Sequence, residues 1–115
     1  MKITRKEAFI VKPNKNTIVY SYPSNNKNIS VALIKVNGRH PENIGEYFIE
    51  MKCHVLFYFI KGFGKVVIKD QVYKITPHDT VIIKSGDKYY LEGKFEYLAS
   101  TSPAYFPEQN KIVRK

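Results

Sequence analysis

The sequence is divided into many short runs of β-branched and aromatic residues, separated by Gly, Pro, Asn and Asp. Such runs are typical of β-strands, and the separating residues favour turns. No window of helical length carries the i, i+3, i+4 apolar stripe of an amphipathic helix. Closely spaced short strands therefore predict an all-β sandwich or barrel, with at most one or two short helical turns.

The expected strands follow directly from these runs. They are residues 8–11, 17–22, 29–36, 47–51, 54–62, 64–69, 71–75, 80–84, 88–93 and 95–102. Gly62 and Gly64 permit a tight reversal between two of them, and Gly86 permits a positive φ in the loop that follows Ile83. Asp79 is placed to accept backbone N–H groups at its turn. A turn or two of helix could lie in 39–46 or near 107–111.

In the run 54–60 the apolar residues occupy both faces, which is typical of a strand buried on both sides. One face would line the interior of the barrel. The other would pack against a partner subunit or be covered by an N-terminal strand of the same chain. A homodimer is therefore one of two expectations.

With 115 residues the chain is expected to form one domain with a sizeable core. Its longest purely apolar run has six residues (55–60), whereas a membrane-spanning helix needs about 20. The first twelve residues lack the apolar region of a signal peptide, so we expect a cytoplasmic protein. Cys53 is the single cysteine, which excludes an internal disulfide and a multi-thiolate metal site.

The net charge of +9 invites a nucleic-acid interpretation. Only three of the 19 basic residues are Arg, the side chain that reads phosphates and bases with two hydrogen bonds. The 16 Lys are scattered along the chain, as on solvated strand faces and edges. Nucleic acid is thus not the expected partner, although a small β-barrel that binds nucleic acid or another polyanion stays an alternative.

Three segments together resemble a cupin domain, a small double-stranded β-helix or jelly-roll barrel: Gly38, the stretch "IKGFGKVVI" and the stretch "YKITPHDTVIIKSGDKYY". The resemblance covers about residues 29–106. "GRHPENIG" and "LASTSPAYFPEQNK" are also similar to segments of small single-domain cupins. The resemblance implies N-terminal strands (1–28) packing on a barrel core (29–106), followed by a basic tail (107–115).

Cupins usually hold a metal ion with two His, a Glu and a further His. The resemblance places the Glu at Val55 and the last His at Tyr89. The first two His fall at Ile49 and Met51, or at Phe48 and Glu50 if the intervening gap is one residue longer. None of these positions carries the family's ligand, and a catalytic metal needs at least three donors. His40, His54 and His78 show no ligand spacing of their own. We therefore expect no metal and no cofactor.

Eight residues are the candidate ligand-binding set. Four would form an apolar floor (Ile49, Met51, Val55 and Phe57), two would offer phenol groups (Tyr89 and Tyr97), and two would lie at the rim (Arg39 and His40). If Ile49 and Met51 face inward, strand parity directs Glu50 outward. The alternative roles are plain core packing for the tyrosines and surface positions for the rim residues. Tyr90 should face away from the cavity.

The sequence thus predicts a metal-free, cupin-like domain that binds a small polar organic molecule, such as a sugar or related metabolite, with no specific reaction implied. One alternative is a metal-independent isomerase or epimerase, in which a His or Tyr moves a proton next to a carbonyl. That enzyme would need His40 or His54 close to Tyr89. Cys53 is expected to be a small core residue, because its neighbour His54 points to the opposite face of the strand.

Overall fold

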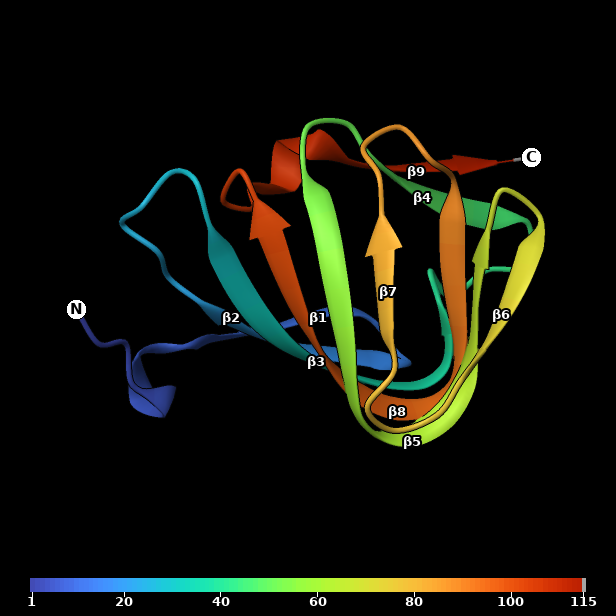
Figure 1. Ribbon diagram of the computed structural model, residues 1–115, viewed down its shortest axis with the longest axis horizontal. Helices are drawn as coiled ribbons and strands as arrows, with labels where there is room; N and C mark the ends of the chain where they lie inside the picture. Colours follow the sequence, from blue (N-terminus) through green and yellow to red (C-terminus); the bar gives the residue numbers. More distant parts are fainter. Residues whose placement is uncertain (115) are drawn as a thin grey trace.

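The computed structural model describes residues 1–114, in which nine strands pair into one antiparallel sheet that curls into a barrel (Figure 1). This confirms the predicted all-β fold. The strands are β1 (Phe9–Asn14), β2 (Thr17–Tyr22), β3 (Ser30–His40), β4 (Glu46–Glu50), β5 (His54–Ile68), β6 (Gln71–Ile75), β7 (Thr80–Ile83), β8 (Tyr89–Ser102) and β9 (Asn110–Arg114).

The barrel is built around two long strands, β5 and β8, which pair along most of their length and bend together into a U (Figure 1). At the bend Gly64 lies opposite Gly93. A Cβ atom added at Gly64 would lie 2.4 Å from the carbonyl oxygen of Glu92, so the close approach of the strands requires glycine. The expected reversal at Gly62 and Gly64 is therefore wrong, because the glycines let one strand bend and continue.

The other strands extend this pair at both sides. The order β1-β2-β3-β8-β4-β9 forms one path through the sheet, and β6 and β7 pair with the two halves of β5. The segment 107–115, expected as a basic tail, instead contributes the 3₁₀ helix η2 (Pro107–Gln109) and strand β9, which pairs with β4. Lys115, the last residue of that expected tail, lies outside the described residues.

Inward-facing residues of β5 alternate with outward-facing ones. Val55, Phe57 and Phe59 are buried, whereas Leu56 and Tyr58 are 36–40% exposed. Burial of β5 on both faces is thus not found within one chain. No N-terminal strand covers the outer face, because β1 pairs with β2 at the far end of the sheet path. Coverage by a partner subunit stays a prediction.

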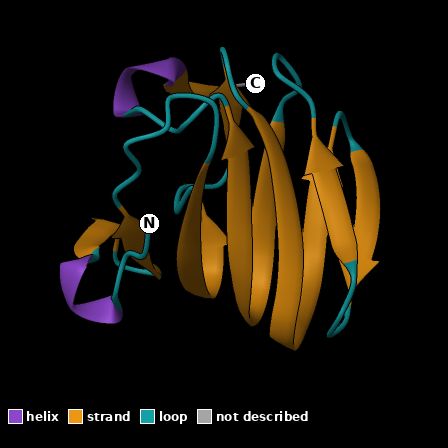
Figure 2. Ribbon diagram, turned by 60° about the vertical axis from the view of Figure 1, so that its left-hand side comes forward, coloured by secondary structure: helices purple, strands orange, loops and turns teal. Residues whose placement is uncertain are grey.

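In residues 1–114 the helical content is limited to η1 (Arg5–Glu7) and η2, two single 3₁₀ turns that lie beside the strands in Figure 2. The prediction of a helical turn near 107–111 is confirmed, and the one in 39–46 is not. Two turn predictions are also confirmed: Asp79 accepts the N–H of Thr76 at 2.8 Å, and Gly86 has a φ of +93°. No helix in residues 1–114 has the length and apolar character needed to cross a membrane.

Candidate functional site

The inside of the curled sheet holds a cavity of about 540 Å³. Its walls come from β1 to β5 and β8, together with the C-terminal segment around η2. Most of its lining side chains are apolar or aromatic. Its polar lining includes His40, Glu50 and Tyr97. A concave, largely apolar space with a few fixed polar groups is the usual form of a small-molecule site.

Five of the eight predicted residues line this cavity: His40, Val55, Phe57, Tyr89 and Tyr97. The outward position predicted for Tyr90 agrees with its place next to the buried Tyr89 on β8 and with its absence from the cavity lining. Whether the five contact a ligand stays a prediction. The structure does show that β3, β5 and β8 bring them to one space.

Ile49 and Met51 do not line the cavity, and Met51 is 52% exposed. Glu50 is instead 3% exposed and faces inward with Phe48. The expected parity of β4 is therefore wrong by one residue. Apolar character favoured Met51 for the interior, but β4 ends at Glu50, and polar partners from distant segments compensate the burial of its carboxylate.

Arg39 is buried but does not reach the cavity. Its guanidinium donates to two backbone carbonyls of the loop that follows β3, those of Pro41 at 2.8 Å and Asn43 at 2.5 Å, and to the carbonyl of Glu46 at the start of β4 at 2.7 Å. It also lies 4.0 Å from the centre of the Tyr90 ring. Five donors in a fixed fork suit this task, so Arg39 holds the loop and is not a rim residue.

His40, the last residue of β3, is positioned by the turn between β1 and β2. Asn14 closes this turn by accepting the backbone N–H of Asn16 on Oδ1, which leaves its Nδ2 directed at His40 Nδ1, 3.0 Å away. Thr17 Oγ1 lies 3.1 Å from the same nitrogen. Because Asn14 Nδ2 only donates, His40 Nδ1 accepts and the ring proton of the neutral form lies on Nε2.

Burial keeps this ring uncharged. Removal from water lowers the pKa of His40 from 6.5 to about 4. Nε2 makes no hydrogen bond to residues 1–114. Every fully enclosed polar side-chain atom in that range has a partner, so Nε2 is not fully enclosed. Nε2–H is therefore a donor that opens into the cavity.

Glu50 is the centre of a second polar group, which we call the Glu50 cluster (Glu50, Tyr89, Gln109 and Asn110). The Tyr89 hydroxyl and Asn110 Nδ2 donate to Oε2, the latter at 3.0 Å, and Gln109 Nε2 donates to Oε1 at 2.6 Å. The Gln109 amide is fixed because its Oε1 accepts the backbone N–H groups of Lys52 and Cys53. Three donors thus converge on one buried carboxylate from β8, η2 and β9.

The cavity phenols are strongly perturbed. Burial and then the nearby Glu50 carboxylate raise the pKa of Tyr89 well above its usual value, and the same two causes raise the pKa of Tyr97. Burial, then Glu50, then other neighbours raise the pKa of Tyr105 at the C-terminal wall to about 12. All three hydroxyls therefore keep their protons at neutral pH, and the Tyr89 hydroxyl uses its proton to donate to Glu50.

Sequence reasoning missed several of these polar groups. Asn14, Thr17, Gln109 and Asn110 lie up to 96 positions apart in the sequence and carry no motif. The one local signal is the pair of adjacent amides at 109–110, which is unremarkable in a loop. Their roles follow only from the pairing of β9 with β4 and from the β1–β2 turn at the end of β3.

The donor set does not fit a cupin metal. The positions where the resemblance places ligands do face the cavity, in the register that puts the first two at Phe48 and Glu50, followed by Val55 and Tyr89. Only Glu50 among them is a customary ligand, and its oxygens already accept three hydrogen bonds. Within residues 1–114 no three His, Cys, Asp or Glu side chains form a group that could hold a metal.

The other reactive side chains lie outside the cavity. Cys53 is fully buried, and its thiol, whose pKa burial raises, donates to the Pro103 carbonyl at 3.4 Å. His54 accepts the N–H of Ser85 at 3.2 Å on the outer face, as strand parity predicted. His78 pairs with the Tyr58 hydroxyl in an exposed turn. None of these residues lines the cavity.

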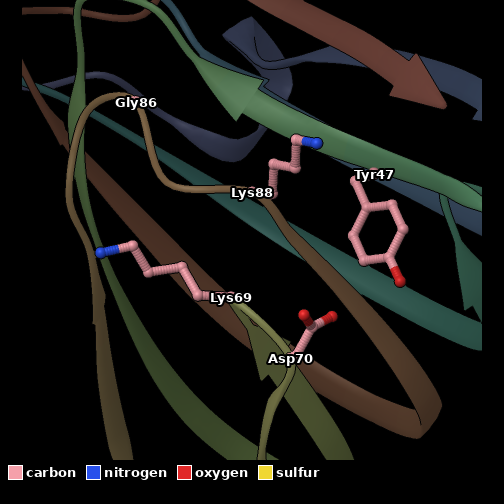
Figure 3. Close-up of a pocket in the computed structure, with 5 residues that line it drawn as sticks. All are labelled: Tyr47, Lys69, Asp70, Gly86 and Lys88. Atoms are coloured by element: carbon pink, nitrogen blue, oxygen red, sulfur yellow. The ribbon is translucent and has the colours of Figure 1, made fainter. Parts of the chain in front are cut away.

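A smaller hollow of about 260 Å³ lies on the surface between the turn after β5 and the loop before β8 (Figure 3). Lys69, Asp70 and Lys88 border it together with Tyr47 and Gly86. In Figure 3 the ammonium group of Lys69 points away from Asp70, and it lies 3.5 Å from Asp87. This hollow has less than half the volume of the central cavity, which is therefore the stronger candidate site.

Structural comparison places this arrangement among known barrels. An RmlC-like cupin from Shewanella frigidimarina matches with a TM-score of 0.69 at 13% identity, over 86% of each chain. The fold is that of the cupins. Streptomyces Pac13, a nucleoside dehydratase, matches with a TM-score of 0.87 at 16% identity, over 99% of this chain and 91% of Pac13. The polyketide cyclase RemF from Streptomyces resistomycificus gives 0.71 at 14% identity, over 99% and 84%.

No protein-family model and no curated protein sequence matches the chain. At such low identities the structural matches establish the cupin fold and leave the activity open. The cupin resemblance drawn from the sequence is confirmed at the level of the fold.

Proposed function

We propose that this cupin-fold protein binds a small polar organic molecule in its central cavity without the help of a metal ion. One observation carries the proposal: a largely apolar cavity of about 540 Å³ contains two separately anchored polar groups, His40 and the Glu50 cluster. Groups held by such networks are pre-organised, so a ligand meets them without first ordering them.

The size and lining of the cavity support a ring-bearing ligand. Drug-sized sites span roughly 300–1,000 Å³. An arc of rings, here called the aromatic arc, runs along the wall in the order His40, Phe48, Tyr89, Phe57, Tyr97, with neighbouring centroids 4.6 to 5.9 Å apart. Aromatic faces and edges favour flat or sugar rings by dispersion and polar contacts. Sugars, nucleosides and related metabolites fit this description.

The structural neighbours point the same way. Pac13 structures are described with uridine, and they include variants in which a histidine is changed to glutamine or a tyrosine to phenylalanine. By analogy, a nucleoside or a modified nucleoside is the first ligand class to test here. The analogy rests on a shared fold at 15–17% identity, so it sets a priority among ligands and carries no residue roles.

A second candidate function is metal-independent acid–base catalysis on a sugar or keto compound. Two observations favour it: His40 and Tyr89 flank the same Phe48 ring and line one cavity, and Tyr89 is hydrogen-bonded to a buried carboxylate. A neutral imidazole N–H could polarise a carbonyl, while the Tyr89–Glu50 pair exchanges a proton with its neighbouring carbon or oxygen. His54, the other histidine considered for this role, faces outward.

A thermal-shift screen of sugars, nucleosides and keto acids, run with and without EDTA, tests the main proposal. We expect some neutral metabolites to raise the melting temperature, with no effect of EDTA. The matched variants are Ala99→Leu, which fills the cavity, and Ser100→Leu, which adds the same side chain at the next residue of β8, outside the lining. Cavity binding is supported if the ligand no longer raises the melting temperature of Ala99→Leu but still raises that of Ser100→Leu. A melting temperature that falls with EDTA and recovers with a divalent metal contradicts it.

A further inference from the structure

The Tyr97 hydroxyl is a buried polar group that residues 1–114 leave without a hydrogen-bond partner. The side chain is 1% exposed, and its ring packs against Phe57 and Phe59 at centroid distances of 4.9 and 5.2 Å. Its hydroxyl makes no hydrogen bond within residues 1–114. Every fully enclosed side-chain polar atom in that range does have a hydrogen-bond partner, so the Tyr97 hydroxyl is not fully enclosed. The hydroxyl must therefore open into the cavity that Tyr97 lines. A phenol held this way needs a partner from water or from a ligand.

The free Nε2–H of His40 lies at the other end of the aromatic arc. It and the Tyr97 hydroxyl are thus two hydrogen-bonding groups on one wall, separated by the rings of Phe48, Tyr89 and Phe57. Packing of its ring fixes Tyr97, and the hydrogen bonds of Nδ1 fix His40. Each side chain therefore keeps one polar atom, the Tyr97 hydroxyl or His40 Nε2, that is not used within residues 1–114. This is the pattern of groups reserved for a ligand.

The charge of the cavity contrasts with that of the whole chain. The protein carries a net charge of +9, yet no Lys or Arg in the described residues lines the cavity. Glu50 is the one charged lining residue in the described part of the chain. His40 cannot supply a positive charge at neutral pH because burial holds its ring in the neutral form. An anionic ligand would therefore bring its charge next to a buried carboxylate without any compensating cation, which is unfavourable at low dielectric.

We propose that the cavity selects uncharged, hydroxyl- or carbonyl-bearing ring compounds, with Tyr97 and His40 as their hydrogen-bonding partners, and rejects their phosphorylated counterparts through Glu50. This inference rests on the proposed cavity function and narrows it to a ligand class. It implies that a nucleoside or free sugar binds whereas the corresponding nucleotide or sugar phosphate does not. The basic exterior then plays no part in recognition at the site.

The test is a thermal-shift and calorimetric screen arranged in matched pairs: uridine with uridine 5′-monophosphate, adenosine with adenosine 5′-monophosphate, and glucose with glucose 6-phosphate. We expect stabilisation only by neutral members. Glu50→Gln should reduce the discrimination between the members of a binding pair. Phosphorylated members that bind as tightly as the neutral ones overturn the inference but leave cavity binding intact. No binding by any compound in these pairs or in the wider screen contradicts the cavity function itself.

Tyr97→Phe separates a ligand-binding role from a structural one. Because the hydroxyl has no protein partner, the variant should unfold at the same denaturant concentration as the parent or at a slightly higher one. Its Kd for the neutral ligand should rise roughly five- to tenfold, as expected for one lost hydrogen bond. Tyr90→Phe, which removes a phenol hydroxyl outside the cavity, is the control and should leave the Kd unchanged. An unchanged Kd in Tyr97→Phe, or a clear loss of its stability without ligand, contradicts the assignment.

Discussion

The Tyr89 hydroxyl donates a hydrogen bond to Oε2 of Glu50, and both side chains are at most 4% exposed. One residue comes from β8 and the other from the end of β4, two strands that pair at a single position, Phe48 with Tyr89. The bond therefore joins two parts of the barrel wall that the backbone ladder holds only weakly. It also gives the buried carboxylate one of its three donors.

Tyr89→Phe should lower the free energy of unfolding by about 1–3 kcal/mol, because it leaves a buried carboxylate with one donor fewer. Urea denaturation measures this change. Tyr90→Phe on the outer side of the same strand serves as the matched control and should change stability by less than about 0.5 kcal/mol. Equal effects of the two substitutions would show that the Tyr89–Glu50 bond does not contribute to stability.

Gln109 connects the C-terminal segment to the cavity wall, since its amide donates to Glu50 and accepts from Lys52 and Cys53. Gln109→Ala should cost about 2–4 kcal/mol, because the buried Glu50 carboxylate, the buried Cys53 N–H and the part-buried Lys52 N–H lose their partner together. Gln71→Ala, at an exposed position of β6, is the control. Hydrogen exchange should show faster opening of β9 in Gln109→Ala, and unaltered protection there would argue against this anchoring role.

The stability of the protein should depend on His40 between pH 7 and 4. The folded-state pKa of about 4 lies below the ordinary 6.5, so the unfolded chain binds the proton more readily in this window. Stability linked to this group is fully present above pH 6.5 and is lost as the pH falls toward 4, by about 3 kcal/mol in all.

Carboxylates titrate in the same range, so the measurement is a comparison of the parent with His40→Gln by urea denaturation at each pH. The advantage of the parent over the variant should shrink by about that amount between pH 7 and 4. A constant difference across the range would mean that His40 titrates normally in the folded protein.

The close pairing of β5 and β8 at their bend depends on the absence of a side chain at Gly64. Gly64→Ala would place a Cβ 2.4 Å from the Glu92 oxygen and 2.5 Å from the Phe95 ring, and should cost about 2–4 kcal/mol or prevent folding. Gly45→Ala, where a Cβ meets nothing within 4 Å and only the φ of +90° opposes it, should cost about 1 kcal/mol. Melting temperatures of the two variants decide the ranking, and the reverse order would contradict the close approach at Gly64.

Arg39 should matter for folding rather than for recognition. Arg39→Lys keeps the positive charge but loses the fork that reaches three carbonyls, so we expect a loss of about 1–3 kcal/mol in stability. The Kd of a cavity ligand, measured where the variant is fully folded, should stay the same. A large change in Kd with unchanged stability would restore the rim position expected for Arg39 from the sequence.

Local signals in the sequence were sufficient for part of the site. The cupin resemblance placed Val55 and Tyr89 on the inner face of their strands, and period-2 alternation then placed Phe57 inside and His54 and Tyr90 outside. These strands are long and regular, so the parity of one residue fixes that of its neighbours. The alternation of β4 was misjudged because the strand is short and apolar residues occur on both of its faces.

What the sequence by itself determined is the class of fold and, once the cupin resemblance had fixed one inward position on a long strand, the direction of that position's neighbours. The first follows from residue types close together in the chain, and the second follows from the pleat. Tertiary structure alone decided that Gly62 and Gly64 bend a strand instead of ending it, since the reason is the backbone of β8 lying against them. It also decided that Glu50 faces inward. A carboxylate can be buried only where donors meet it, and its donors Tyr89, Gln109 and Asn110 come from segments 39 to 60 residues away.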